Sequence, residues 1–194
     1  NPKLVNLTAD WIPATVYNVT EGVYVAVGYG RCNPTLIEGT DGLIVVDPGE
    51  SVTSAQLAKA AFNEHLNNIF SKKPVKAIIY THYHDCHIHG ATVFAGNDSP
   101  EIIAHETLEA NLFDPAAVES QIYPIKIYRA VKYAGIVYQK DRGYFLNGGI
   151  FPFSVPGPSG YLPPTLTVKD RLETNIAGVN LTLIHAPGET SDII

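Results

Sequence analysis

The residues best suited to chemistry lie together in one stretch, His82-Tyr83-His84-Asp85-Cys86-His87-Ile88-His89. Four histidines, one aspartate and one cysteine within these positions could hold a metal ion, because imidazole is the commonest metal ligand in proteins. Core packing does not account for them, since each buried imidazole needs a polar partner. His82 and His84 are two apart on a chain that we expect to be extended, so they project to the same side and can bind one ion. A solvated histidine-rich loop is the alternative interpretation.

The elements around this stretch place it at the end of a core strand. The short apolar run from Val75 to Tyr80 follows Pro74 and predicts a buried parallel strand. The histidines therefore lie on the loop that leaves the carboxyl end of this strand, where open α/β sheets bind their ligands. Upstream, 51–70 predicts a helix, with Ser51 or Thr53 as its cap. Its apolar face would be formed by Leu57, Ala61, Phe62, Leu66 and Ile69.

Strand-like segments occur on both sides of the histidine stretch. We predict strands in 16–27, at 35–38 and 43–47 around a hairpin turn at 39–42, and at 101–104, 165–168 and 179–183. Helices are predicted at 90–95, 107–112 and 118–138, and an ordered loop near a binding cleft at 143–164. The strand 179–183 delivers a second polar cluster, His185 to Glu189, at a strand end. We expect 190–194 to begin a further strand.

The overall composition limits the class of protein. With 194 residues, 45% hydrophobic and 16% charged, we expect one globular domain over 1–194. A net charge of -6 without any basic run argues against a nucleic-acid partner. The sequence has no apolar run of about 18 residues, so no membrane span is expected. The chain contains no methionine and begins Asn1-Pro2-Lys3, so we interpret it as a processed or incomplete piece of a longer protein.

The cysteines and glycosylation sequons favour an extracellular location. Asn6, Asn18 and Asn180 each begin an Asn-x-Thr sequon, which predicts a secreted glycoprotein. The only two cysteines are Cys32 and Cys86; an even number suggests a disulfide in a secreted protein, and thiols or ligands in a cytosolic one.

The order of these elements resembles the metallo-β-lactamase superfamily, an α/β fold built as an αββα sandwich. The family signature Thr-His-x-His-x-Asp-His is matched in register by Thr81, His82, His84 and His87. Cys86 stands where the family has its aspartate, Asp85 is acidic but one position early, and His89 replaces the first of two glycines. The turns Asp47-Pro48-Gly49 and Pro187-Gly188-Glu189 also match family landmarks. Within the superfamily the chain is most similar to the alkylsulfatases.

The resemblance implies a zinc site and assigns residues to it. His82, His84 and Glu189 would hold a first zinc ion, and Cys86 and His87 would begin the site of a second. Asp47 and Asp85 are the candidate catalytic carboxylates. Asp47 would orient the ligands from behind, or be an ordinary strand-end turn residue. Two zinc ions that share a hydroxide lower its pKa toward neutrality.

The implied function is hydrolysis of a sulfate ester or a related small anionic ester. The Asp-to-Cys departure and the short chain motivate a second hypothesis, a catalytically weakened protein with a structural or assembly role outside the cell. A third is a redox or persulfide-type enzyme that uses Cys86. Since the family continues beyond this length, we expect only the N-terminal part of the sandwich, completed by an oligomer partner or a companion chain.

Cys86 has three possible states in this framework. We favour a Cys32–Cys86 disulfide, which would remove a ligand of the second metal; a zinc-bound thiolate and a free thiol are the alternatives. Of the remaining histidines, we expect His105 to be structural at a strand end, with ligand support as the alternative, and His65 to lie on a helix surface.

Overall fold

The structure is a computed structural model that describes residues 14–114 and 154–194, together with the isolated positions 3, 116, 121, 124, 125 and 128. The helix predicted at 118–138, the first part of the loop predicted at 143–164, and the sequon at Asn6 lie outside the described ranges or almost entirely so.

The main sheet has seven strands in sequence order, from β1 at one edge to β7 at the other. The first four strands are antiparallel neighbours, whereas β4 to β7 run parallel to one another. The parallel half therefore brings the carboxyl ends of β4, β5 and β6 to one edge, as predicted for the histidine loop. The strands are β1 (Thr15–Thr20), β2 (Val23–Val27), β3 (Thr35–Glu38), β4 (Leu43–Val46), β5 (Val75–Ile79), β6 (Glu101–His105) and β7 (Leu166–Val168).

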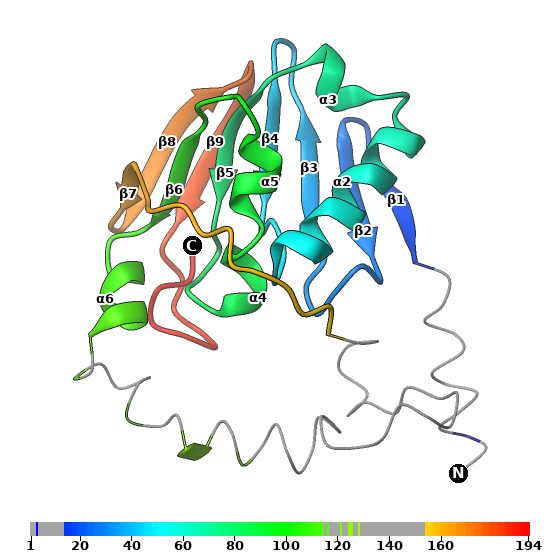
Figure 1. The fold of residues 1–194 in the computed structure, drawn as a ribbon. Helices are drawn as coiled ribbons and strands as arrows, with labels where there is room; N and C mark the ends of the chain where they lie inside the picture. Colours follow the sequence, from blue (N-terminus) through cyan, green and yellow to red (C-terminus); the bar gives the residue numbers. More distant parts are fainter. Residues whose placement is uncertain are drawn as a thin grey trace.

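Helices cover one face of this sheet (Figure 1). Phe62 of α2 and Phe94 of α5 are fully buried in the same core cluster as Leu43, Val45 and Ile78 of the strands. Burying side chains of this size stabilises the fold by about 1.5–3 kcal/mol each. The helices are α2 (Val52–His65), α3 (Ile69–Lys72), α4 (Asp85–Ile88), α5 (Ala91–Ala95) and α6 (Leu108–Phe113). In the part of the chain that the structure describes, no helix has the length and apolarity to cross a membrane.

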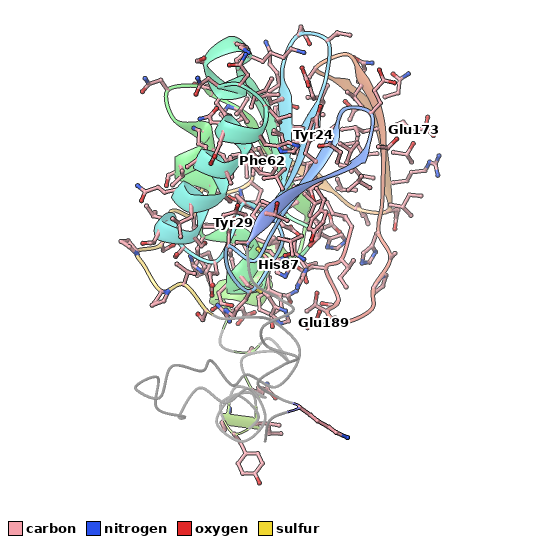
Figure 2. All side chains as sticks on the ribbon, turned by 90° about the vertical axis from the view of Figure 1, so that its right-hand side faces the viewer. Tyr24, Tyr29, Phe62, His87, Glu173 and Glu189 are labelled. Atoms are coloured by element: carbon pink, nitrogen blue, oxygen red, sulfur yellow. The ribbon has the colours of Figure 1, made fainter. Side chains whose placement is uncertain are left out.

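A two-stranded antiparallel sheet, β8 (Arg171–Ile176) and β9 (Val179–Ile184), covers the opposite face. Leu181 and Leu183 pack with Ile44 and Ile79 of the main sheet in a second core cluster. Figure 2 shows the helical side with Phe62 and the β8–β9 side with Glu173 on opposite sides of the main sheet. The described residues thus form three layers, helices, main sheet and a short second sheet, as expected for the first part of an αββα sandwich.

The helix predicted at 51–70 is shorter than expected, and its buried face differs. Ser51 caps it by accepting a hydrogen bond from the backbone N–H of Ser54, but α2 ends at His65. Asn67 and Asn68 then adopt positive φ angles of 54° and 59°, a conformation that asparagine tolerates and that interrupts the helix. The small residues Ala55 and Ala58, with Phe62, form the buried face, whereas Leu57 is 48% exposed.

The strands predicted within 16–27 form the hairpin of β1 and β2. Two differences from the predicted strands remain. β8 was not predicted, because polar as well as apolar residues set its alternation, Arg171-Leu172-Glu173-Thr174-Asn175-Ile176. The segment 190–194 is a turn and not a strand, because its backbone bonds loop partners: the N–H of Ile194 donates to the carbonyl of Thr81 at 3.0 Å.

Candidate metal centre

The centre lies where β5 and β9 end. The chain leaving β5 carries Thr81, His82 and His84 into α4, and the chain leaving β9 carries Glu189. Figure 2 shows His87 and Glu189 at the same end of the molecule. The side chains of His82, His84 and Glu189 converge, with one ligand atom of each within 4.8 Å of the others. The family resemblance implied this convergence.

Hydrogen bonds decide which atom of His82 faces the cluster. The hydroxyl of Thr81 donates to Asp47 Oδ2 at 2.8 Å, so its oxygen must accept from His82 Nδ1, which lies 3.0 Å away. His82 is then protonated on Nδ1, and Nε2 keeps a lone pair. Burial, followed by the rings of His87 and His84, lowers the pKa of His82. The imidazole is therefore neutral at neutral pH, as a metal ligand must be.

The other two side chains complete a three-sided cluster. Nδ1 of His84 lies 2.9 Å from Nε2 of His82 and 3.6 Å from Oε1 of Glu189. His82 is 6% exposed, whereas the side chain of Glu189 is 69% exposed, so the cluster is buried on one side and open on the other. Two imidazoles and one carboxylate with an open side could hold a metal ion. Catalytic zinc sites are one class that uses such a ligand set and keeps a fourth position for water or substrate.

Asp47 orients this cluster from behind. Its backbone has a φ of 54°, an uncommon conformation that aspartate tolerates. Its carboxylate accepts hydrogen bonds from the N–H and the hydroxyl of Thr81, both at 2.8 Å, and contacts Nδ1 of His87 at 2.8 Å. These three bonds are compatible with the supporting role, which stays a prediction.

Cys86 and His87, which were predicted to begin a second metal site, make hydrogen bonds within the protein. Burial alone would lower the pKa of His87, but hydrogen bonds with Asp47 and Cys86 outweigh it and raise the pKa to about 10. The His87 ring also lies over the ring of His82, with centroids 4.2 Å apart. Within the described ranges, Cys86 and His87 belong to no group of three metal-ligating side chains. Their role as ligands stays a prediction.

The predicted disulfide is not formed, because both cysteines are free thiols. Each has its own partner: the buried Cys32 lies 3.9 Å from the carbonyl oxygen of Asp47, and Cys86 hydrogen-bonds His87. The sequons at Asn18 and Asn180 are exposed on β1 and β9. Glycosylation and secretion stay predictions.

Asp85, the second candidate catalytic carboxylate, does not join the three converging side chains. Its Oδ2 accepts a hydrogen bond from Arg31 Nη2 at 3.0 Å. Burial alone would raise the pKa of Asp85, but Arg31 outweighs it and holds this pKa below its usual value. Arg31 is in turn bound to Glu50, and neither residue stood out in the sequence. The position of Glu50 directly after the Asp47-Pro48-Gly49 turn was the one feature of the sequence that could have indicated it.

Two further histidines brace the loop that carries Glu189. The rings of His105 and His185 stack with centroids 4.0 Å apart. His105 Nδ1 accepts from the N–H of Thr107 at 3.2 Å, so Nε2 must donate to the carbonyl of Lys169 at 3.0 Å. Both nitrogens are used, which supports the structural role predicted for His105. His65 lies on the helix surface as predicted, 2.7 Å from Asn18 Oδ1.

Comparisons with known proteins agree with this arrangement. The family model of the metallo-beta-lactamase superfamily matches residues 27–194. A linear primary-alkylsulfatase from a Pseudomonas species is 34% identical over 164 residues, which are 82% of this chain and 30% of the relative. The subunit alpha of a 2,4-dinitroanisole O-demethylase from a Nocardioides species is 35% identical over 101 residues, covering 52% of this chain and 27% of that protein.

Among solved structures, the stereoselective inverting sec-alkylsulfatase Pisa1 from a Pseudomonas species superposes with a TM-score of 0.75 at 22% identity. The match covers all of this chain and 31% of Pisa1. The chain therefore spans about a third of the length of these relatives, and the similarity in structure concerns the fold.

Proposed function

Because this chain belongs to the metallo-beta-lactamase superfamily, we propose that it is the metal-binding part of a zinc-dependent hydrolase that acts on a sulfate ester or a related small anionic ester. The convergence of His82, His84 and Glu189 within 4.8 Å carries this proposal. Their donor set suits zinc, and a zinc ion supplies a nucleophile at neutral pH by lowering the pKa of coordinated water.

The residues of the chain itself prepare the site. Thr81 and Asp47 hold His82 in the tautomer whose Nε2 faces the cluster, so the ring of His82 is oriented before the ion binds. His84 and Glu189 supply the other two donors. Asp47 also contacts the ring of His87, so one carboxylate orients a histidine before α4 and another within it.

The class of ester is proposed from the relatives. Alkylsulfatases are among the proteins that match, whereas the O-demethylase carries a name that refers to an ether. The assay should therefore include a primary alkyl sulfate, a secondary alkyl sulfate and an aryl methyl ether. We expect turnover of a sulfate ester that is lost on removal of zinc and in Glu189→Gln. Zinc-loaded protein with no turnover of any of the three would contradict the hydrolase.

Cys86 favours a second candidate function. It replaces the aspartate of the family signature and bonds His87, and no second three-residue metal group forms in the described ranges. A catalytically weakened protein with a structural or assembly role would have these features. Folded protein with at most one bound ion and no turnover would support this candidate, whereas two zinc ions with turnover would support the hydrolase.

A further inference from the structure

We propose that Arg31 is a positioning residue that acts through Asp85 to hold the start of α4 and, with it, the histidines on either side. This inference rests on the metal site proposed above. It concerns a contact between the β2–β3 loop, which carries Arg31, and the histidine stretch.

The helix α4 depends on outside contacts for its position. It has four residues, and its N-cap, His84, makes no side-chain capping bond. A single helical turn is not stable by itself in water. Its middle is held by the bond from His87 to Asp47. Just beyond its end, Gly90 packs so closely that an added Cβ would lie 2.2 Å from the carbonyl oxygen of Pro48.

The start of α4 is held by Arg31. Nη2 of Arg31 donates to Asp85 Oδ2 at 3.0 Å, while Asp85 also accepts the backbone N–H of Cys86. The side chain of Asp85 is 60% exposed. An exposed ion pair of this kind usually contributes little, because ordering two long side chains offsets the attraction. Arg31 avoids most of this cost only if its guanidinium is already fixed.

Glu50 provides that fixation. Its side chain is 1% exposed and pairs with Nε of Arg31. It also accepts the backbone N–H of Arg31 at 3.1 Å, the hydroxyl of Ser154 at 2.9 Å and the N–H of Val155 at 2.6 Å. A buried carboxylate with four donors cannot turn away, so the guanidinium is presented to Asp85 in one orientation.

The charges argue against an anion-binding role for Arg31. One guanidinium lies between two carboxylates, Glu50 and Asp85, which leaves the group with a net negative charge. An anionic substrate would be repelled by this group as a whole. Positioning of α4 is the role that the contacts support.

The test compares zinc binding by Arg31→Gln, Asp85→Ala, Asp85→Asn and the unchanged protein, by competition against a chromophoric zinc chelator. We expect Arg31→Gln and Asp85→Ala to weaken zinc affinity by about tenfold or more, as loss of a supporting contact does. Removing the positive charge of Arg31 would by itself tighten the binding of a cation. A loss of affinity in Arg31→Gln therefore indicates positioning and not charge.

Arg31→Gln leaves Glu50 unpaired and could fail to fold, which circular dichroism would show. In that case Asp85→Asn separates the effect of positioning from the effect of charge. Asparagine keeps an oxygen that can accept from Arg31, so we expect a smaller loss than in Asp85→Ala. Equal losses would overturn the proposal, and so would a folded Arg31→Gln that binds zinc as tightly as the unchanged protein.

Glu173→Ala is the matched control, because it breaks the exposed Arg171–Glu173 pair on β8 without touching the centre. We expect it to leave zinc affinity unchanged. If the unchanged protein binds zinc and the folded variants of Arg31 and Asp85 bind it equally well, the positioning role is overturned but the proposed function is not. An unchanged protein that takes up no zinc would overturn the proposed function as well.

Discussion

At His82, a neighbouring hydroxyl determines which ring nitrogen is available to a metal ion. The hydroxyl of Thr81 donates its hydrogen bond to Asp47, so its oxygen can only accept from Nδ1 of His82. This chain of two hydrogen bonds fixes both the tautomer and the orientation of the ring. The residues that tune the centre therefore include side chains that would not themselves touch the ion.

The first prediction tests this chain of bonds. Thr81→Val keeps the volume but removes the hydroxyl, so His82 loses the partner of its Nδ1. We expect zinc affinity to fall by about 10- to 100-fold. Thr81→Ser retains the hydroxyl and should bind zinc nearly as well as the unchanged protein in the same competition titration. Equal affinities in Thr81→Val and Thr81→Ser would show that the hydroxyl does not orient the ring.

The second prediction concerns Asp47 in the metal-free protein. Asp47→Asn keeps one acceptor oxygen, but its amide NH₂ faces groups that donate, so we expect a loss of about 1–3 kcal/mol in the free energy of unfolding. The loss should depend on pH, because the pKa of His87 is raised to about 10 and Asp47 helps to raise it.

The sign follows from the two states of His87. The folded chain holds the proton up to a pH of about 10, whereas the unfolded chain releases it at the ordinary histidine pKa of about 6.5. The stabilisation is complete below about pH 6.5 and is lost as the pH rises through 10. The difference between unchanged protein and Asp47→Asn in urea unfolding should shrink across this window. A difference that grows with pH would contradict the assignment.

At the scale of elements, the corner between α4 and α5 brings the histidine stretch against the turn after β4. Gly90 lies at this corner, where an added Cβ would be 2.2 Å from Pro48 O and 2.6 Å from Ala55 Cβ. Backbone and a buried helix cannot move aside easily. The close approach requires glycine at position 90, which is also where the family signature has one.

The third prediction is that Gly90→Ala destabilises the protein by about 1–3 kcal/mol through overpacking. Gly188→Ala is the control, because its nearest neighbour would be Ile193 Cδ1 at 3.5 Å, an ordinary contact. Thermal unfolding of the two variants beside the unchanged protein gives the comparison. A Gly90→Ala variant as stable as Gly188→Ala would mean that the corner is looser than the structure shows.

Elements with a strong local pattern are the ones that can be predicted from the sequence. The apolar run of β5, the hairpin turn at 39–42 and the alternation of β9 each define their element without help from distant residues. β8 was missed because its pattern is filled by both polar and apolar side chains. The apolar face predicted for α2 was wrong at Leu57, because close packing on the sheet selects the smaller Ala55 and Ala58, whereas the other four predicted residues lie in the core or pack against it.

The spacing of His82 and His84 was enough to predict that they share one ion, whereas Glu189 was assigned to the same ion by the family resemblance. The three side chains do converge in the structure. The bonds of Arg31 with Glu50 and Asp85 were not predictable, because they join residues far apart in the chain through loop geometry. The Cys32–Cys86 disulfide was predicted from the even number of cysteines and the expected position of their loops, but both thiols are free: Cys32 lies near the carbonyl oxygen of Asp47, and Cys86 bonds its neighbour His87.

At the scale of the whole molecule, the two sheets are unequal. The main sheet has seven strands, whereas the second has two, and neither outer edge of β8 and β9 has a partner strand among the described residues. Unpaired edges bind further strands readily. The chain also spans about 30% of the length of the alkylsulfatase that it matches. The unpaired edges support the proposal that a companion chain or a second copy covers them.

The fourth prediction is therefore that the 194-residue chain associates in solution. Sedimentation equilibrium should give a mass above the 21.0 kDa of one chain, in a concentration-dependent manner. Thr174→Lys places a charge on the inward side of β8, a device that blocks edge pairing, and should shift the equilibrium toward the monomer. A strictly monomeric unchanged protein at all concentrations would argue against an exposed pairing edge.

The central claim is that His82, His84 and Glu189 bind one zinc ion. The most direct measurement is the anomalous difference density at the zinc absorption edge, from crystals grown with zinc. We expect one peak about 2.0–2.2 Å from His82 Nε2, His84 Nδ1 and a carboxylate oxygen of Glu189. Crystals of fully zinc-saturated protein with no peak at these three side chains, or with zinc bound only elsewhere, would contradict the claim.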